Sequence, residues 1–466
     1  MRLLIIVVLS LSLTPVWAAD WTRFRGPNGS GVAESARLPV EFGPGLNQAW
    51  KTELAFGASS PVVAGGRLWL TAREADKLIT LCLDAASGKI LWRRQIDRPR
   101  QERHHKLNDP ASPTPVTDGS NVYVFFPDFG LVSYGPDGNE RWRHPVGPFQ
   151  NMFGMAGSPV LAGGKLVLVC DQQKGSFLMA VDKDSGKRSW RVDRTGTGIG
   201  WAAPIVRKTA DGEELIVFSN RRVEGVSLAN GARRWWHNLV LDGSNGVPLL
   251  DGDTLYVNAP GYDQPWIQSF AAGLEKLDSN KDNLITAAEL AKDPELTDFF
   301  DYLDDNGDGK VDAREWEIAR QAGVGEYGLT ALKLGPANEL PKGAVAWRLK
   351  RNLPYVPAPI LYQGLLFMVK AGGIITTVDP KTGEIFKAGR SAKAPGDYYA
   401  SPVAADGKVF LLSQEGKLTV LKAEAQWEVL AVNDMLEECL ATPAIANGRI
   451  YVRTRTALYS FQAAAF

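Results

Sequence analysis

The stretch Ser60-Pro61-Val62-Val63-Ala64-Gly65-Gly66-Arg67-Leu68-Trp69-Leu70 sets the fold of this chain, because its pattern recurs along the sequence. A small residue and a proline precede two apolar residues, then come a glycine-containing turn and a short apolar strand. Glycine punctuates turns, and short apolar runs between turn signals favour strands. The stretch therefore predicts one β-hairpin of a repeated unit.

The same pattern begins at prolines that stand about 41–54 residues apart, with one longer step of about 111 residues. These prolines are Pro61, Pro115, Pro159, Pro204, Pro248, Pro359, Pro402 and Pro443. A second hairpin often turns at Asp-x-x-(Ser/Thr)-Gly-(Lys/Glu) and ends in an aromatic residue, as at Trp92, Trp142 and Trp190. Four strands repeated at this period predict a β-propeller.

The two ends of the chain are expected to share one unit. The last unit, from Pro443, finishes near Phe461 without a final aromatic strand. A strand of that type, Ala49-Trp50-Lys51, stands before the first unit. Pairing these segments would remove a free sheet edge. We therefore predict an all-β, eight-bladed propeller that is closed by its N-terminal strand.

The longer step lies in the fifth unit and contains two acidic loops, loop one (278–289) and loop two (304–315). Calcium takes about six to eight oxygen ligands, and in loops of this length they come from positions 1, 3, 5, 7, 9 and 12. The residues at positions 1, 3, 5, 7 and 12 are Asp278, Asn280, Asp282, Leu284 and Glu289 in loop one, and Asp304, Asn306, Asp308, Lys310 and Glu315 in loop two. Leu284 and Lys310 would offer only their backbone carbonyls. The tandem loops predict two bound Ca²⁺ ions.

The two loops differ at positions 6 and 9. Position 6 turns sharply and favours glycine; loop two has Gly309, whereas loop one has Asn283, a residue that tolerates the left-handed region. Loop two has a further carboxylate at position 9, Asp312, so we expect it to bind calcium more tightly. Ile285 and Val311 at position 8 are expected to pair the loops through a short strand.

Two family resemblances follow from these motifs. The loops and their flanking helix signals, over roughly 265–322, resemble the EF-hand family. The repeats from about Trp50 to Phe461 resemble the pyrroloquinoline-quinone-like (PQQ-like) propeller repeats, and the segment 21–28 looks like the start of secreted bacterial members. The resemblance implies an EF-hand pair inserted in blade five of the ring. Dehydrogenases of that family hold PQQ against adjacent cysteines, and this sequence has no Cys-Cys pair, so PQQ is not the expected cofactor.

The sequence also predicts the domain order. A basic residue, an apolar run and Ala18-Ala19 are typical of a signal peptide, 1–19, cleaved after Ala18 or Ala19. The predicted domains are an N-terminal extension at 20–48, the propeller at 49–260 and 326–466, and the EF-hand pair at 261–325. We expect a periplasmic or secreted protein that does not span the membrane, since no later stretch is long and apolar enough.

Charge and cysteine content restrict the partners. Lys plus Arg and Asp plus Glu number 52 each, and nucleic-acid-binding proteins usually have a basic excess, so no nucleic-acid partner is expected. Cys82, Cys170 and Cys439 are an odd number spread far apart, which does not make a disulfide framework. They are expected to be small buried side chains, with one bridge and a spare thiol as the alternative.

Polar loops are expected to gather on one face of the ring. The long connection 98–109 holds two of the four histidines. We predict a ligand rim on this face that draws on His104, His105, Asp109, Gln172, Arg221 and Tyr398. Such a rim suits a sugar, a peptide or a cofactor, and a solvated basic loop without a ligand is the alternative interpretation.

These observations favour a secreted, calcium-binding propeller that acts as a binding or assembly scaffold for a protein or carbohydrate partner. Non-catalytic members of the PQQ-like family include periplasmic scaffolds for outer-membrane protein assembly. A PQQ-dependent oxidoreductase is the alternative, and a hydrolase that uses His104 or His105 with Asp109 is a third hypothesis. The sequence has no glycine-rich phosphate loop, nucleophile elbow or HExxH zinc motif, which favours a non-enzymatic protein.

Overall fold

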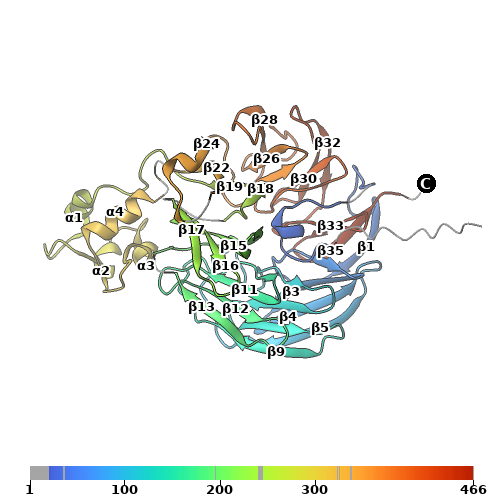
Figure 1. Ribbon diagram of the computed structural model, residues 1–466, viewed down its shortest axis with the longest axis horizontal. Coiled ribbons are helices and arrows are strands. Elements are labelled where there is room, and N and C mark those ends of the chain that lie inside the picture. The colour runs from blue at the N-terminus through green and yellow to red at the C-terminus, as the bar shows by residue number, and fades with distance from the viewer. Residues whose placement is uncertain are drawn as a thin grey trace, which may run out of the picture.

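A computed structural model describes residues 20–34, 37–194, 196–239, 245–322, 324, 326–335 and 338–464; the predicted signal peptide, 1–19, lies outside these residues. Eight antiparallel sheets stand around a central axis, so the predicted eight-bladed propeller is confirmed (Figure 1). Seven sheets have four strands, and the sheet of blade 4 has a short fifth strand. The first strands of neighbouring blades contact each other from blade 6 through blades 7, 8, 1 and 2 to blade 3.

The strands of the first four blades are β2 (Val62–Ala64), β3 (Arg67–Glu74), β4 (Lys77–Asp84) and β5 (Ile90–Asp97) in blade 1; β6 (Val116–Thr117), β7 (Val122–Phe126), β8 (Gly130–Tyr134) and β9 (Glu140–Pro145) in blade 2; β10 (Val160–Ala162), β11 (Lys165–Cys170), β12 (Phe177–Asp182) and β13 (Arg188–Asp193) in blade 3; and β14 (Ile205–Thr209), β15 (Gly212–Phe218), β16 (Arg222–Ser227), β17 (Arg233–Asn238) and β23 (Asn338–Glu339) in blade 4.

The strands of the other four blades are β18 (Leu249–Asp251), β19 (Thr254–Ala259), β22 (Gly328–Lys333) and β24 (Val345–Leu349) in blade 5; β25 (Ile360–Tyr362), β26 (Leu365–Lys370), β27 (Ile374–Val378) and β28 (Ile385–Arg390) in blade 6; β29 (Val403–Ala405), β30 (Lys408–Leu412), β31 (Lys417–Lys422) and β32 (Val429–Asp434) in blade 7; and β33 (Ala444–Ala446), β34 (Arg449–Arg453), β35 (Ala457–Gln462) and β1 (Gln48–Glu53) in blade 8. Short 3₁₀ turns are η1 (Pro27–Gly29) and η3 (Lys342–Ala344).

The repeated tryptophan and glycine lock neighbouring blades together. In blade 2, the Trp142 ring lies so close to Gly186 of blade 3 that a Cβ there would be 2.5 Å from the ring. The Trp142 indole N–H donates to the carbonyl oxygen of Lys183 in blade 3, at 2.9 Å. The same contact recurs for the pairs Trp50–Gly88, Trp92–Gly138, Trp190–Gly231 and Trp347–Gly383. The Gly of the turn motif is therefore required by the aromatic residue of the preceding blade.

The ring closes as predicted, with the N-terminal strand in the last blade. β1 pairs antiparallel with β35, from Gln48 opposite Phe461 to Glu53 opposite Ala457. Trp50 of β1 is buried and its ring lies 5.9 Å from that of Tyr451. Blade 8 therefore has four strands, three from the C-terminal end of the chain and one from the N-terminal region.

The residues before β1 lie across the centre of the ring, where Figure 1 shows them in dark blue. This channel segment, 21–33, bonds to the first strands of distant blades: Trp21 pairs with Val63 of blade 1, and Ala33 donates to the carbonyl oxygen of Ala404 of blade 7. Arg23 and Arg25 are buried and donate to backbone carbonyl oxygens of blades 4 and 6. The segment therefore crosses the centre of the ring and ties blades from opposite sides of it.

The acidic loops form a helical insertion in blade 5, projecting from the edge of the ring (Figure 1). Its elements are α1 (Phe270–Leu277), β20 (Ile285–Thr286), α2 (Ala287–Leu290), η2 (Thr297–Phe299), α3 (Phe300–Leu303), β21 (Lys310–Val311) and α4 (Ala313–Gln321). It leaves after β19 and returns at β22, and these strands pair directly, with Ala259 opposite Gly328. The insertion has its own apolar core, which includes Leu277, Leu303 and Trp316. The predicted insertion in blade five is thus confirmed, whereas the exact domain boundaries stay a prediction.

The three cysteines are free and buried, as expected from their spacing. Burial raises the pKa of the Cys82 thiol to about 12 and that of Cys439 still further. None of the helices in the described part of the chain is long and apolar enough to cross a membrane.

Candidate metal loops and ring face

Loop two is held in its turn by its own side chains. The Asp304 carboxylate accepts from the amides of Gly307 at 2.6 Å and Gly309 at 3.1 Å. Glu315 accepts from Asn306 N at 2.9 Å and so closes the end of the loop onto its beginning. Asp304 and Glu315 are almost fully buried. An ionised carboxylate has about four acceptor sites, so these amides leave capacity for a cation.

Loop one repeats this arrangement. Asp278 accepts from the amides of Lys281 at 2.7 Å and Asn283 at 3.0 Å. Glu289 accepts from the amides of Ser279 and Thr286, and the Thr286 amide is the main reason that the pKa of Glu289 is lowered to about 2. Asn283 has φ 62°, as expected for position 6. Glu289 is therefore ionised and available to a cation at neutral pH.

The two loops lie back to back. Ile285 of loop one pairs with Val311 of loop two in the short β20–β21 ladder, as predicted. In loop two, Asp312 caps α4 by accepting from Glu315 N at 2.8 Å. The ladder fixes the loops relative to each other, and the cap fixes Glu315 at the start of its helix.

The donor set fits a hard cation. Among the described residues, no three His, Cys, Asp or Glu side chains form a metal cluster by themselves. Loops of this kind also use asparagine and backbone carbonyl oxygens. Asn280 and Asn306, at position 3 of the two loops, each donate to the position 5 aspartate and accept from its amide. Both loops therefore hold oxygen donors of the required types in the required order.

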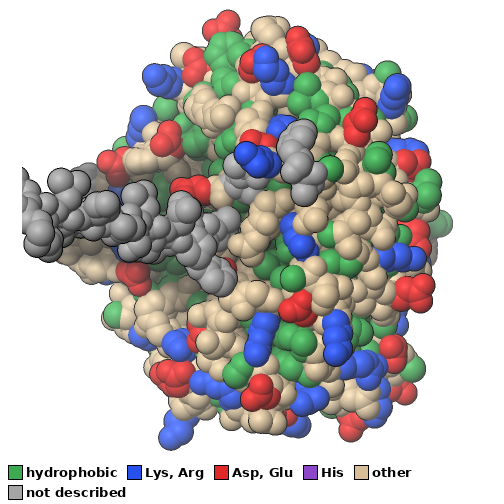
Figure 2. All heavy atoms as spheres, turned by 90° about the vertical axis from the view of Figure 1, so that its right-hand side faces the viewer, with side chains coloured by type: hydrophobic (Ala, Val, Ile, Leu, Met, Phe, Trp, Pro, Cys, Tyr) green, Lys and Arg blue, Asp and Glu red, His purple; other side chains and the backbone are tan. Residues whose placement is uncertain are grey.

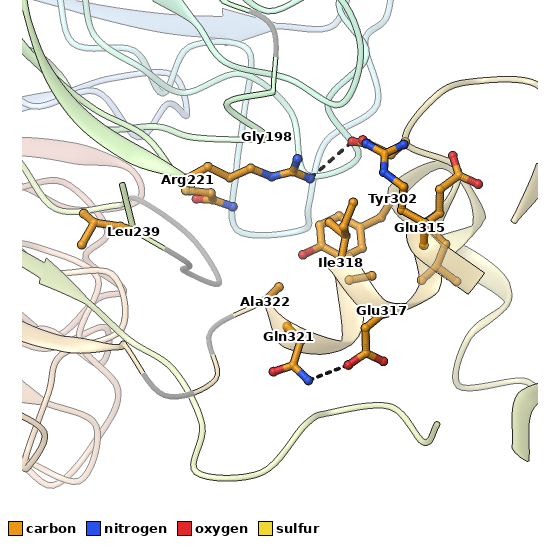
Figure 3. A pocket seen from close by; sticks show the side chains of 14 residues that line it. Gly198, Arg221, Leu239, Tyr302, Glu315, Glu317, Ile318, Gln321 and Ala322 are labelled. Carbon is orange, nitrogen blue, oxygen red and sulfur yellow. Dashed lines mark hydrogen bonds and ion pairs between the residues drawn. The ribbon is translucent and has the colours of Figure 1, made fainter. Parts of the chain in front are cut away.

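A cleft separates the insertion from the ring (Figure 3). It has a volume of about 560 Å³ and is lined by α4 residues such as Ile318 and Ala319, with Tyr302 beside them and Leu239 and Gly198 on the ring side. Figure 3 shows the Arg221 side chain extending from the ring toward the insertion. It forms an ion pair with Asp305, with Nη2 and Oδ1 3.3 Å apart.

Two of the predicted rim residues are exposed histidines. His104 Nδ1 lies 3.2 Å from the His105 carbonyl oxygen, and His105 Nδ1 accepts from Leu107 N at 3.3 Å. Asp109 is buried; it forms an ion pair with Arg73 and accepts from Ala111 N. In the hydrogen bonds of the described side chains, neither histidine is joined to Asp109. The histidine–aspartate pair needed by the hydrolase hypothesis is not formed here.

The other rim residues are engaged with the protein itself. Gln172 braces its loop by donating to the Gly175 carbonyl oxygen and accepting from Gln150 N. The buried Tyr398 hydroxyl donates to the Ala394 carbonyl oxygen at 2.8 Å, and burial raises its pKa. Arg221 faces the insertion rather than the axis. The rim as a ligand site stays a prediction.

A buried charge cluster beneath these loops was missed by sequence reasoning. Arg194 bonds to Asp171 at 2.8 Å and also forms an ion pair with Glu224, and all three side chains are at most 3% exposed. The cluster joins the end of β11 to β16 of the next blade. A glutamate between Val223 and Gly225 in β16 was the signal that could have revealed it, since buried charges require partners.

Comparison with known proteins fits this architecture. Residues 47–177 and 111–264 match the family described as outer membrane protein assembly factor BamB, and residues 296–318 match the EF hand family. Loop two lies within the EF hand match, 296–318, and loop one lies before it. These matches confirm the resemblance to PQQ-like propeller repeats and to the EF hand.

Individual proteins with similar sequences or folds fit the same propeller architecture. The outer membrane protein assembly factor BamB of Yersinia pestis is 22% identical over 392 residues, which cover 82% of this chain and 89% of that protein. The crystal structure of BamB from Moraxella catarrhalis has a TM-score of 0.54 at 11% identity, covering 89% of this chain and 99% of that chain. Quinohemoprotein alcohol dehydrogenase from Comamonas testosteroni has a TM-score of 0.60 at 11% identity, covering 96% and 81%. At such identities the two structures establish the shared fold alone.

Proposed function

We propose that this chain is an extracytoplasmic propeller that binds calcium through loops one and two and serves as a protein-binding scaffold. The observation that carries the calcium proposal is the loop two arrangement, in which buried Asp304 and Glu315 face a turn made by Gly309. The proposed ligands of loop two are Asp304, Asn306, Asp308, Lys310 and Glu315, and those of loop one are Asp278, Asn280, Asp282, Leu284 and Glu289. Bound calcium would neutralise these carboxylates and cross-link each loop.

Three observations support the scaffold proposal. The relative from Yersinia pestis carries the name of an outer membrane protein assembly factor. The channel segment 21–33 crosses the ring centre, which leaves the ring face and blade edges for a partner. On the side of the ring opposite the insertion, Figure 2 shows acidic and basic side chains interspersed, and a face of mixed sign favours a protein partner over a polyanion such as nucleic acid. The relative's name and the predicted leader, 1–19, support a place outside the cytoplasm.

Calorimetry with calcium alone tests the metal proposal. The wild-type chain is expected to show up to two sites with Kd of about 10⁻⁴–10⁻³ M, the range of extracellular calcium modules. Glu315→Gln is expected to abolish the loop two site, because it removes the carboxylate that closes that loop. Glu317→Gln, an exposed change on the same helix, is the matched control and should bind as the wild type does. A flat wild-type titration at millimolar calcium would contradict the proposal.

A pull-down from the native membrane fraction tests the scaffold proposal. Outer membrane proteins, the class named for the relative from Yersinia pestis, are expected to be retained by the wild-type chain. Reduction of a dye by the protein incubated with PQQ, calcium and an alcohol, without such retention, would instead favour an oxidoreductase.

A further inference from the structure

A basic residue of the ring lies against loop two. Lys174 follows β11 in blade 3, and its Nζ is 3.5 Å from Asp304 Oδ2. The lysine side chain passes over Gly307 so closely that a Cβ there would be 2.6 Å from Nζ. Asp304 is the first ligand position of loop two, and its side chain is only 4% exposed. The ammonium group is thus a cation already placed beside a proposed calcium ligand.

Two more ion pairs bring ring arginines to the same side of the insertion. Arg221 of blade 4 reaches Asp305 at 3.3 Å, and Arg103, in the connection after blade 1, reaches Asp298 at 3.7 Å. In the ion pairs between described residues, none joins the ring to the carboxylates of loop one. The ring therefore directs its positive charge at loop two and the turn before it.

We propose that Lys174 is a built-in competing cation for loop two, so that calcium binding and docking of the insertion on the ring oppose each other. The inference rests on the proposed calcium binding. An ammonium group beside Asp304 attracts the same carboxylate as calcium and repels the incoming ion. Coupling between two binding events is reciprocal, so docking that weakens calcium binding is itself weakened by calcium to the same extent. Gly307 makes this possible, because a side chain there would keep Lys174 away.

The competition acts against the order of affinities expected from the ligands, in which loop two binds calcium more tightly than loop one. Asp312 adds a carboxylate to loop two, but it also caps α4, and Lys174 and Arg221 add two positive charges nearby. The ring therefore lowers the calcium affinity of loop two, whereas the calcium affinity of loop one depends on its own ligands. Arg221 and Asp305 line the 560 Å³ cleft, so release of this ion pair on calcium binding would widen it.

Calcium titration of Lys174→Met in the full chain tests the inference. Methionine keeps most of the length of the unbranched side chain and removes the charge. The loop two site is expected to tighten by about 1.5- to 5-fold, the change that corresponds to loss of one partly exposed ion pair, and the loop one site to stay unchanged. Lys187→Met, at the opposite end of β12 in the same blade, is the matched control and should leave both affinities as in the wild type.

Hydrogen exchange gives a second readout. In the Lys174 loop, Gln173 N donates to the Gln150 carbonyl oxygen and Gln172 N to Ser176 Oγ. Added calcium is expected to speed exchange at 172–175 in the wild type and not in Lys174→Met. If the wild type binds calcium but Lys174→Met binds it equally and exchange does not change, this inference is overturned while calcium binding stands. If the wild type binds none, both are overturned.

Discussion

Arg25 in the channel segment is a fully buried cation whose partners are all neutral. Its guanidinium donates to the carbonyl oxygens of Gly29 at 3.1 Å, Ala358 at 3.2 Å and Pro359 at 2.8 Å. Burial lowers the pKa of Arg25 to about 9, because desolvation disfavours the charged form. The planar fork of arginine can reach several carbonyls at once, which is what this position requires.

Arg25→Met is expected to lower the free energy of unfolding by about 2–4 kcal/mol, because several buried carbonyls lose their donor. Arg25→Lys should also destabilise, since a single ammonium group does not span the same acceptors. Denaturant unfolding of the full chain measures both. Arg37→Met, an exposed change in the same N-terminal extension, should shift stability by less than about 0.5 kcal/mol. Similar losses at positions 25 and 37 would contradict this account.

The buried cysteines give a pH-dependent prediction. The thiolate is the reactive form, and an unfolded thiol ionises near pH 8.5, whereas the pKa of Cys82 is raised to about 12. Near pH 8.5 the native protein should react slowly with a thiol reagent, and the denatured protein should react at all three cysteines. Because the folded thiol keeps a proton that the unfolded chain releases, the contribution of Cys82 to stability falls as pH rises through 9 to 12. Fast labelling of native protein would show that a thiol is accessible.

Sequence reasoning succeeded at residues whose role is set locally. Asn283 has the left-handed conformation expected from its place in the loop. Tyr398 and Gln172 were assigned to the rim because they lie in polar loops, yet both side chains turn back into the protein. The direction of a loop side chain depends on neighbours from other blades, such as Gln150 for Gln172, and a single sequence does not reveal these.

At the level of blades, the tryptophan–glycine contact gives a sharp test. Gly186→Ala would place a Cβ 2.5 Å from the Trp142 ring at φ 68°, whereas Gly164 has φ 75° and nothing within 4 Å. Both alanine variants share the cost of positive φ, about 1 kcal/mol. Gly186→Ala should lose a further 1–3 kcal/mol or so through overpacking of the seam. Thermal unfolding compares them, and equal melting temperatures would mean that the seam contact contributes little.

Elements were predictable where the repeat fixed them. β1 was expected in blade 8 because a strand with an aromatic residue stood alone before the first repeat and the last repeat lacked one. The channel segment was not foreseen, because 21–33 has no period. Its partners are backbone groups of blades 1, 2, 4, 6 and 7, which are far apart in sequence. Because the segment bonds to backbone groups, the partner strands need no particular side chains, and their sequences do not reveal the contact.

For the whole molecule, the insertion is expected to be separable from the ring. Replacing 261–325 by a short Gly/Asn turn should give a folded propeller that binds no calcium, because β19 and β22 already pair without it. The ion pairs between insertion and ring are partly exposed and each contribute about 0–1 kcal/mol. Circular dichroism and calcium calorimetry on the shortened chain check this. An unfolded product would mean that the insertion is a structural part of blade 5.

The closing strand has a consequence for how the protein is made. β1 and the channel segment leave the ribosome well before β35, with which β1 pairs and which lies on the order of 400 residues later. Until β35 has emerged β1 has no neighbour, and until blade 7 has emerged the channel segment lacks the backbone that it joins. Closure of the ring is therefore delayed until blade 8 has emerged. An unfinished or clipped chain would carry an open blade edge, a surface that attracts chaperones and proteases.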